Sequence, residues 1–236
     1  MNLILLEPGD YIAAQRVRLG GRRCEHIREI LDATPGEQLR VGDIGGLMGV
    51  GKVFKREADS IELEVSLTQA PPPKLPLTLI LALPRPKMLR RIFRSVAELG
   101  VRELILLNTY KVEKSYWQSP ALADATMRGY LLDGLQQARD TILPAVRCAR
   151  LFKPFVEDEL PAMVGNGAAL VAHPGVAAPC PVALNRDCTL AIGPEGGFTA
   201  YEVEKLQQAG LQPVQMGERI LRVENALTSL VARLFT

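Results

Sequence analysis

The 236-residue sequence lacks the features that mark several large classes of protein. Its four cysteines form no Cys-x-x-Cys pair, which argues against a structural zinc site and a thioredoxin-like redox motif. No apolar run approaches the length of about 20 residues that a membrane-spanning helix needs. The first residues also lack the basic start of a secretory signal. We therefore expect a cytoplasmic protein with free thiols, no metal and no membrane partner.

Aromatic side chains make up only 5% of the chain, so we do not expect stacking on an aromatic surface to be its main way of holding nucleic acid. A net charge of +2 indicates no particular partner either. The distribution of charge is more informative, because residues 74–114 carry nine basic side chains against three carboxylates. A local positive field of this kind attracts a polyanion. The nine are Lys74, Arg85, Lys87, Arg90, Arg91, Arg94, Arg102, Lys111 and Lys114.

The glycine-rich stretch Gly46–Lys52 nearly matches a phosphate-binding loop. The residue after the lysine in that motif is Ser or Thr, which ligates magnesium, and here it is Val53. The motif also requires a helix to follow, whereas the sequence after Lys52 is strand-like. We therefore predict a glycine-rich hairpin here rather than a nucleotide triphosphatase.

The proline-rich stretch at residues 70–76 divides the chain in two. Three consecutive prolines cannot continue a helix or a sheet and favour an extended connector. Residues 1–70 are predicted to hold short strands around one helix, as in a small β-barrel-like module. Residues 74–236 alternate apolar strand-like runs with helical patterns, which predicts an α/β domain with a mainly parallel sheet.

Two helices carry specific expectations. The helix predicted at residues 22–33 places Ile27, Ile30 and Leu31 on one apolar face. The helix predicted at residues 86–99 is amphipathic, with an apolar face and a basic one. The basic face holds Lys87, Arg90, Arg91 and Arg94.

The last fifth of the chain contains two apolar runs, each of which leads into a glycine-bearing turn. They are Thr189–Phe198 and Pro213–Ala226. Parallel α/β proteins build small-molecule sites where buried strands end in such turns. The G-x-G-x-x-G spacing of a dinucleotide site is absent, which disfavours a nicotinamide- or flavin-dependent oxidoreductase. We expect a single pocket made mostly of main chain.

Four segments together resemble the RsmE family of 16S ribosomal RNA uridine methyltransferases, within the SPOUT superfamily. They are Arg94–Val101, the His173-Pro174 turn, Ile192–Gly197 and Met216–Glu224. The resemblance covers most of the chain, and its two longest motifs occur in the right order and spacing.

The resemblance implies a fold, an activity and partners. The fold is an N-terminal PUA-like β-barrel followed by a SPOUT α/β domain with a C-terminal trefoil knot. The activity is methylation of uridine N3 in 16S rRNA of the small subunit or its precursor, with S-adenosyl-L-methionine as cofactor. Members of the family act as homodimers. The residues themselves specify neither the nucleotide nor the general base.

The implied cofactor site comprises the three turns that follow consecutive strands. Its residues are His173, Pro174, Ile192, Gly193, Pro194, Gly196, Gly197, Met216, Gly217, Ile220, Leu221, Glu224, Asn225 and Ala226. RNA contacts are expected from basic side chains in both halves of the chain. These are Arg16, Arg18, Arg22, Arg23, Arg85, Lys87, Arg90, Arg91 and Arg94.

Three residues are candidates for the chemistry. Arg222 and Arg219 can hold the base or its phosphate, and Glu195 can accept a proton or bind near the sulfonium. Structural alternatives stay open for each. The arginines can pair with Glu218 and Glu224 and brace the turn, and Glu195 can cap the following helix.

The chain departs from the family pattern at two places. Asn225 replaces the usual Thr, although Asn can still hydrogen-bond and can cap the final helix. Gln136-Gln137 replaces a Glu-Gln pair. These changes leave two alternatives open: a catalytically impaired RNA-binding paralogue of the same fold, and a methyltransferase for another RNA nucleotide.

Overall fold

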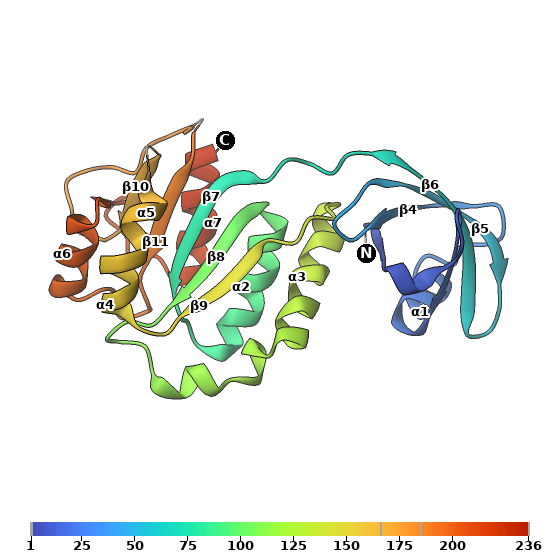
Figure 1. Cartoon of the computed structure of the whole chain (residues 1–236), viewed down its shortest axis with the longest axis horizontal. Helices are drawn as coiled ribbons and strands as arrows, with labels where there is room; N and C mark the ends of the chain where they lie inside the picture. Colours follow the sequence, from blue (N-terminus) through green and yellow to red (C-terminus); the bar gives the residue numbers. More distant parts are fainter. Residues whose placement is uncertain (1, 166, 185, 236) are drawn as a thin grey trace. The chain divides into compact units, whose positions relative to one another are not determined.

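The computed structural model describes residues 2–165, 167–184 and 186–235 (Figure 1). These residues divide into two compact units. The first is Met1–Pro73 with Leu132–Leu143, and the second is Lys74–Leu131 with Pro144–Thr236. The proline-rich connector contains the first boundary. The return of residues 132–143 to the first unit was not expected from the sequence, because the first of these residues belong to a helix (Asp124–Ala138) that begins in the second unit.

The first unit is built on a six-stranded mixed sheet. Its strands are β1 (Ile4–Leu6), β2 (Tyr11–Ala13), β3 (Arg16–Gly20), β4 (Gln38–Asp43), β5 (Met48–Arg56) and β6 (Ser60–Gln69). They lie in the order β1-β4-β5-β6-β3-β2, with β1 parallel to β4 and the other pairs antiparallel. A short 3-10 helix (η1, Pro8–Asp10) and helix α1 (Gly21–Glu29) complete the N-terminal segment. Alternate apolar residues of the strands pack with Cys24 and Ile27 of α1 into one core.

Helix α1 ends earlier than the apolar pattern predicts. Ile27 is fully buried as expected, but Ile30 is 71% exposed and Leu31 is also exposed, so the prediction is wrong for both. The helix stops because the N–H groups of residues 30 and 31 both bond to the His26 carbonyl. Asp32 then takes a positive φ of 46°, which turns the chain away from the helix axis.

The Gly46–Lys52 stretch includes the start of strand β5, whose backbone lies close to that of strand β6 at Gly49. The stretch leads into β5 and therefore lacks the following helix that a phosphate-binding loop requires. A Cβ atom added at Gly49 would lie 1.9 Å from the Ser66 carbonyl oxygen of β6. The glycine allows the two backbones of the β5–β6 hairpin to approach at a shift in their register.

The second unit contains a six-stranded parallel sheet. Its strands are β7 (Leu75–Ala82), β8 (Val101–Leu107), β9 (Ala145–Ala149), β10 (Ala168–Ala172), β11 (Cys188–Ile192) and β12 (Gln212–Val214). Their order is β12-β10-β11-β7-β8-β9. The central strands β7 and β11 are buried on both faces, which is why they read as continuous apolar runs.

Helices cover both faces of this sheet. They are α2 (Pro86–Glu98), α3 (Asp124–Ala138), α4 (Phe152–Pro154), α5 (Leu160–Val164), α6 (Ala200–Gln208) and α7 (Val223–Phe235). Short 3-10 helices precede α3 (η2, Lys114–Gln118; η3, Pro120–Leu122), and a π-helical turn (η4, Phe155–Glu159) joins α4 to α5. Helices α2 and α7 lie on one face and α4 to α6 on the other (Figure 1). The predicted α/β class is thus confirmed, with a mixed and a parallel sheet.

Helix α2 has the two faces predicted for it. It begins with Pro86, whose fixed φ and missing N–H suit the first position of a helix. Its apolar face is buried, and its four basic side chains are exposed. Within the described residues, no helix combines the length and apolar character needed to cross a bilayer.

Candidate functional site

A cleft of about 780 Å³ lies where several parallel strands of the second unit end. Strands β10, β11, β12 and β7 run in the same direction, so the turns that follow them meet at one edge of the sheet. The volume is within the range of about 300–1,000 Å³ that is typical of small-molecule sites. The sequence prediction of one pocket shared by successive strand-end turns agrees with this geometry.

The turn after β11 forms one wall of the cleft. Gly193 and Pro194 are buried, whereas Glu195 and Gly196 are exposed. A Cβ atom added at Gly193 would lie 3.1 Å from the Phe198 ring, so the backbone there is held close to that side chain. The Gly197 N–H bonds to the Pro194 carbonyl at 2.8 Å, and Gly197 has a φ of +70°, which favours glycine.

The turns after β10 and β12 form the opposite wall. The His173 N–H donates to the Val214 carbonyl at 2.9 Å, which ties the two strand ends together. The Nδ1 atom of His173 is buried and has no hydrogen-bond partner among the residues that the structure describes. In the second turn the Gly217 N–H donates to the Gln215 side chain at 2.8 Å, with Gly217 at a φ of +126°. A buried polar atom without a partner in a cleft is a group that a polar ligand atom can satisfy.

The cleft is rimmed by more positive than negative charge. Five basic residues line it, Arg85, Lys87, Arg91, Arg219 and Arg222, against two carboxylates, Glu195 and Glu224. The Glu195 carboxylate accepts the Arg85 N–H at 3.3 Å, so it lies at the start of α2 rather than at the start of the following helix α6. The N-terminus of α6 is instead closed by a reciprocal hydrogen-bonded pair, Thr199 and Glu202.

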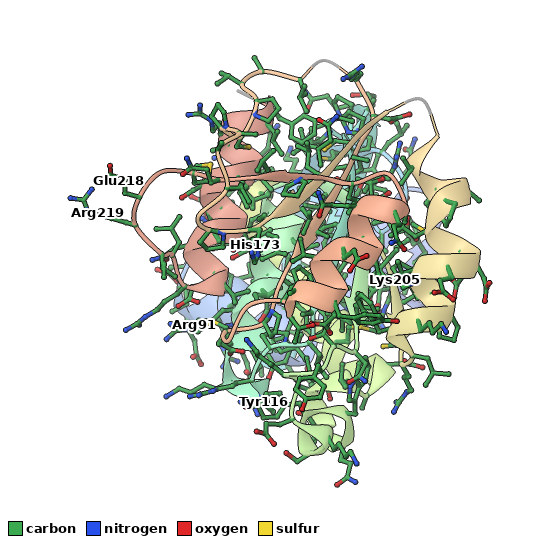
Figure 2. The ribbon with its side chains drawn as sticks, turned by 90° about the vertical axis from the view of Figure 1, so that its left-hand side faces the viewer. Arg91, Tyr116, His173, Lys205, Glu218 and Arg219 are labelled. Carbon is green, nitrogen blue, oxygen red and sulfur yellow. The ribbon has the colours of Figure 1, made fainter. Side chains whose placement is uncertain are left out.

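The two arginines after β12 do not brace the turn through ion pairs. Across residues 2–165, 167–184 and 186–235, the structure shows no ion pair of Arg219 or Arg222 with Glu218 or Glu224. In Figure 2, Arg219 and Glu218 project outward from the tip of their loop, away from His173. Both arginines line the cleft and are exposed, so they can contact a large ligand that covers its mouth.

Most of the residues predicted to bind a cofactor lie together. All of them line the cleft except Gly196 and Asn225. Gly196 faces the loop after β8, where its carbonyl accepts the Lys111 ammonium at 2.7 Å. Asn225 is exposed inside the first turn of α7, which begins at Val223, so it does not cap the helix as the sequence suggested.

Several lining residues were not predicted. They are Met88, Ala172, Phe198, Val214, Gln215, Val223 and Leu230. Most of them are apolar and read as core residues in the sequence. Only their position at a strand end or on a helix that faces the sheet edge could have indicated a cleft.

The basic residues of the second unit that are predicted to bind RNA differ in their surroundings. Arg85, Lys87 and Arg91 line the cleft, whereas the guanidinium groups of Arg90 and Arg94 lie 5.9 and 5.0 Å from the Tyr130 ring.

In the first unit, the predicted arginines already have protein partners. Arg16 stacks 3.7 Å from the Phe54 ring. Ion pairs join Arg18 to Glu62, Arg22 to Asp133 and Arg23 to Asp10. Arg23 is the most deeply engaged, because its guanidinium also donates to the Leu5 carbonyl. Its contacts are those of a structural residue.

The Gln136-Gln137 pair lies at another pocket. The two glutamines belong to the first unit, where they line a polar pocket of about 370 Å³ with Arg22, Glu25 and His26. Neither is among the described residues that line the strand-end cleft.

A family model described as an RNA methyltransferase domain matches residues 71–235. The chain belongs to this family. The match includes the entire strand-end cleft and the helices that support it. No group of three or more His, Cys, Asp or Glu side chains suited to a metal ion occurs in the part of the chain that the structure describes.

Individual relatives agree with the family. The chain is 29% identical to Ribosomal RNA small subunit methyltransferase E of Treponema pallidum, over 98% of this chain and 90% of the relative. It is 22% identical to Ribosomal RNA small subunit methyltransferase E 1 of Borreliella burgdorferi, over 96% and 94%. The resemblance to the RsmE family found in the sequence is confirmed.

A solved structure has the same fold. Ribosomal RNA small subunit methyltransferase E from Neisseria gonorrhoeae, determined bound to S-adenosyl methionine, is similar with a TM-score of 0.76 and 20% sequence identity. The alignment covers 98% of this chain and 95% of that one. The shared fold thus extends over both units.

Proposed function

We propose that this chain transfers a methyl group from S-adenosyl-L-methionine to N3 of a uridine in 16S rRNA of the small ribosomal subunit. The observation that carries the proposal is the convergence of three strand-end turns on one cleft within a chain of the RNA methyltransferase family. The names of the relatives that match along nearly the whole chain supply the class of RNA.

The residues of the cleft fit such a cofactor. Its floor is apolar, with Ile192, Phe198 and Leu230, and suits the adenine and the ribose face. The N–H groups of Gly197 and Gly217 already have partners within their own turns, whereas the buried Nδ1 of His173 lacks a partner within the described chain and is free for a polar ligand atom. The bound cofactor supplies an electrophilic methyl group on a sulfonium.

The basic rim is assigned to the second substrate. Uridine N3 is a poor nucleophile until it loses its proton, and the resulting anion is spread over the imide. Arg222, at the cleft and without an ion pair among the described residues, can stabilise that anion or the adjacent phosphate. Holding the base in line with the methyl group supplies a large share of the acceleration, about 7–11 kcal/mol for well-oriented reactants.

Glu195 is our candidate for the proton acceptor. It lines the cleft, it is exposed, and one of its oxygens is held by the Arg85 N–H at 3.3 Å. That bond orients the carboxylate and leaves its other oxygen available. We assign Arg219, at the tip of the same loop as Glu218, to a phosphate of the RNA (Figure 2).

A knot is the proposed reason that the turns hold their positions. The segment after β10 crosses the C-terminal part of the chain: the Cys180 N–H donates to the Gln215 carbonyl, and the N–H groups of Ala183 and Leu184 donate to the last turn of α7. The Arg233 side chain donates back to the Cys180 carbonyl at 2.8 Å. These contacts support a trefoil knot in which α7 passes through the loop after β10.

The remaining parts of the proposal concern assembly. We propose that the mixed sheet of the first unit serves as the PUA-like RNA-recognition module that the resemblance implies. The basic face of α2 is the proposed surface for the RNA backbone. The chain is proposed to act as a homodimer, in agreement with the family.

The test is methyl transfer from labelled cofactor onto small ribosomal subunits from a strain that lacks this protein, followed by mapping of the modified base. We expect label at N3 of one uridine. The Arg222→Ala variant should lose at least about 100-fold in kcat, whereas Arg186→Ala, an exposed arginine outside the cleft, should not. Label on another base, or full activity of Arg222→Ala, would overturn the corresponding assignment.

A further inference from the structure

The loop after β8 lies beside the cleft and is fixed to it. Strand β8 neighbours β7 in the parallel sheet, so its carboxyl end lies at the same edge as the turns that form the cleft. Loop residues 108–112 are fixed at two points. The Tyr110 N–H donates to the buried Glu202 carboxylate at 2.7 Å, and the Lys111 ammonium donates to the Gly196 carbonyl at 2.7 Å.

The side chain between these two anchors is exposed. Tyr110 is 85% exposed, the largest exposed fraction among the large apolar and aromatic side chains of the described chain. Its backbone is therefore held rigidly while its ring contributes almost nothing to the core. An exposed aromatic ring on an anchored backbone beside a ligand cleft can offer one face for stacking, and only its two side-chain torsions then have to be fixed.

The surroundings of this ring carry positive charge and a second aromatic group. Lys111 and Lys114 lie on the same loop, with Glu113 as the only carboxylate between them. Further along, the Trp117 indole donates to the Asn108 side chain at 2.8 Å, and the Arg150 guanidinium lies 5.0 Å from that ring. Figure 2 labels Tyr116 of this segment in the lower part of the view, below and to the right of Arg91.

We propose that the Tyr110 ring stacks on the unpaired pyrimidine base that enters the cleft, with Lys111 and Lys114 facing the flanking phosphates. The proposal rests on the proposed function for the identity of the base. It is compatible with the low aromatic content of the chain, because it requires one stacking residue rather than an aromatic surface. Aromatic stacking and basic side chains are the two means by which proteins hold single-stranded RNA.

The link from Lys111 to Gly196 gives this contact a second consequence. Gly196 belongs to the same turn as Gly193 and Gly197, which line the cleft. The contact between Lys111 and Gly196 joins the loop after β8 to the turn after β11. A base stacked on Tyr110 is therefore positioned relative to that turn. Lys111 is a positioning residue in this arrangement.

RNA affinity tests the proposal directly. The probe is a fluorescein-labelled, uridine-containing single-stranded RNA, and its dissociation constant is measured by anisotropy at fixed salt. We expect Tyr110→Ala to weaken binding about 5- to 150-fold, the range for loss of one stacked base. Tyr110→Phe should bind as the wild type does. Tyr201→Ala on α6 removes another exposed tyrosine of the same unit and should also bind normally.

Crosslinking locates the contact. With 5-iodouridine in the same RNA, illumination should attach the nucleotide to the tryptic peptide of residues 103–111. Equal affinities of Tyr110→Ala and Tyr201→Ala, or crosslinks confined to other peptides, would overturn the stacking proposal. Cofactor binding and methyl transfer by the wild type report separately on the proposed function, so a chain that binds RNA through Tyr110 but transfers no methyl group disproves only the latter.

Discussion

The carboxylate of Glu202 accepts the backbone N–H of Tyr110 at 2.7 Å, across 92 positions of sequence. The same carboxylate accepts the N–H and the hydroxyl of Thr199, at 2.8 and 2.9 Å. Glu202 is only 3% exposed. A single buried side chain thus closes the N-terminus of α6 and fixes the loop after β8.

We predict that Glu202→Ala lowers the free energy of unfolding by about 2–4 kcal/mol, because three hydrogen-bond donors lose their acceptor and the carboxylate half of the reciprocal cap with Thr199 is lost. Glu204→Ala is the control. Glu204 is an exposed residue of the same helix, and its replacement should cost less than about 0.5 kcal/mol. Urea denaturation measures both. Equal stabilities of the two variants would show that the buried carboxylate is not structural.

The turn after β11 yields a second prediction. Gly193→Ala places a methyl group 3.1 Å from both the ring and the N–H nitrogen of Phe198, so the turn must shift away from its present course. We expect the variant to fold but to bind S-adenosyl-L-methionine at least about 10-fold more weakly. The stabilisation of the melting temperature by saturating cofactor measures this. If the cofactor raises the melting temperature of the variant as much as that of the wild type, Gly193 does not contribute to the site.

Alanine substitutions at two glycines outside the cleft should change the stability of the chain in opposite directions. Gly49→Ala brings a Cβ to 1.9 Å from the Ser66 carbonyl oxygen, so the β5–β6 hairpin must separate, at a cost of about 3 kcal/mol or more. At Gly129, inside α3, an added Cβ meets nothing within 4 Å. Gly129→Ala should therefore stabilise the chain by about 0.5–1 kcal/mol. Thermal denaturation of both variants tests the strand and helix assignments together.

The thiols provide a test that needs no substitution. Cys148 is exposed, whereas Cys24, Cys180 and Cys188 are buried. Burial raises the pKa of the Cys188 thiol to about 12, so this group stays neutral and unreactive near pH 8. Ellman's reagent should titrate one thiol per native chain and all four in denaturant. Rapid reaction of more than one thiol in the native protein would contradict the buried positions.

Reaction of Cys148 should also depend on pH in a defined direction. Cys148 counts as exposed, but its thiol is partly buried, and this partial burial raises the pKa of the thiol above its usual range. The thiolate is the reactive form, so the midpoint of the rise in rate with pH should lie above that of a free thiol such as glutathione. A midpoint at or below that of the free thiol would contradict the raised pKa.

The sequence predicts the local elements better than the contacts between them. Helix α2 could be predicted in detail because its apolar and basic faces alternate with the helical period, and the structure confirms both faces. Ile30 and Leu31 continue the apolar period of α1, but the chain turns at Asp32 before they can pack. The short strand β1 was not predicted, since its pairing with β4 depends on residues about 37 positions away.

The cleft could be predicted where glycine marks the end of a strand, as at Gly193 and Gly217. Its other half could not, because Met88 and Leu230 read as ordinary core residues of their helices. The anchors of the loop after β8 were not predicted either. The contacts Tyr110–Glu202 and Lys111–Gly196 follow from the order of strands in the sheet, and no local pattern encodes that order.

Calorimetric titration of the wild-type chain with S-adenosyl-L-methionine tests the central claim most directly. The convergence of the three strand-end turns predicts saturable binding of one cofactor per chain, which Gly193→Ala weakens and Arg186→Ala leaves unchanged. No saturable binding by the folded wild type, or equal affinity in the two variants, would contradict the assignment of the cleft.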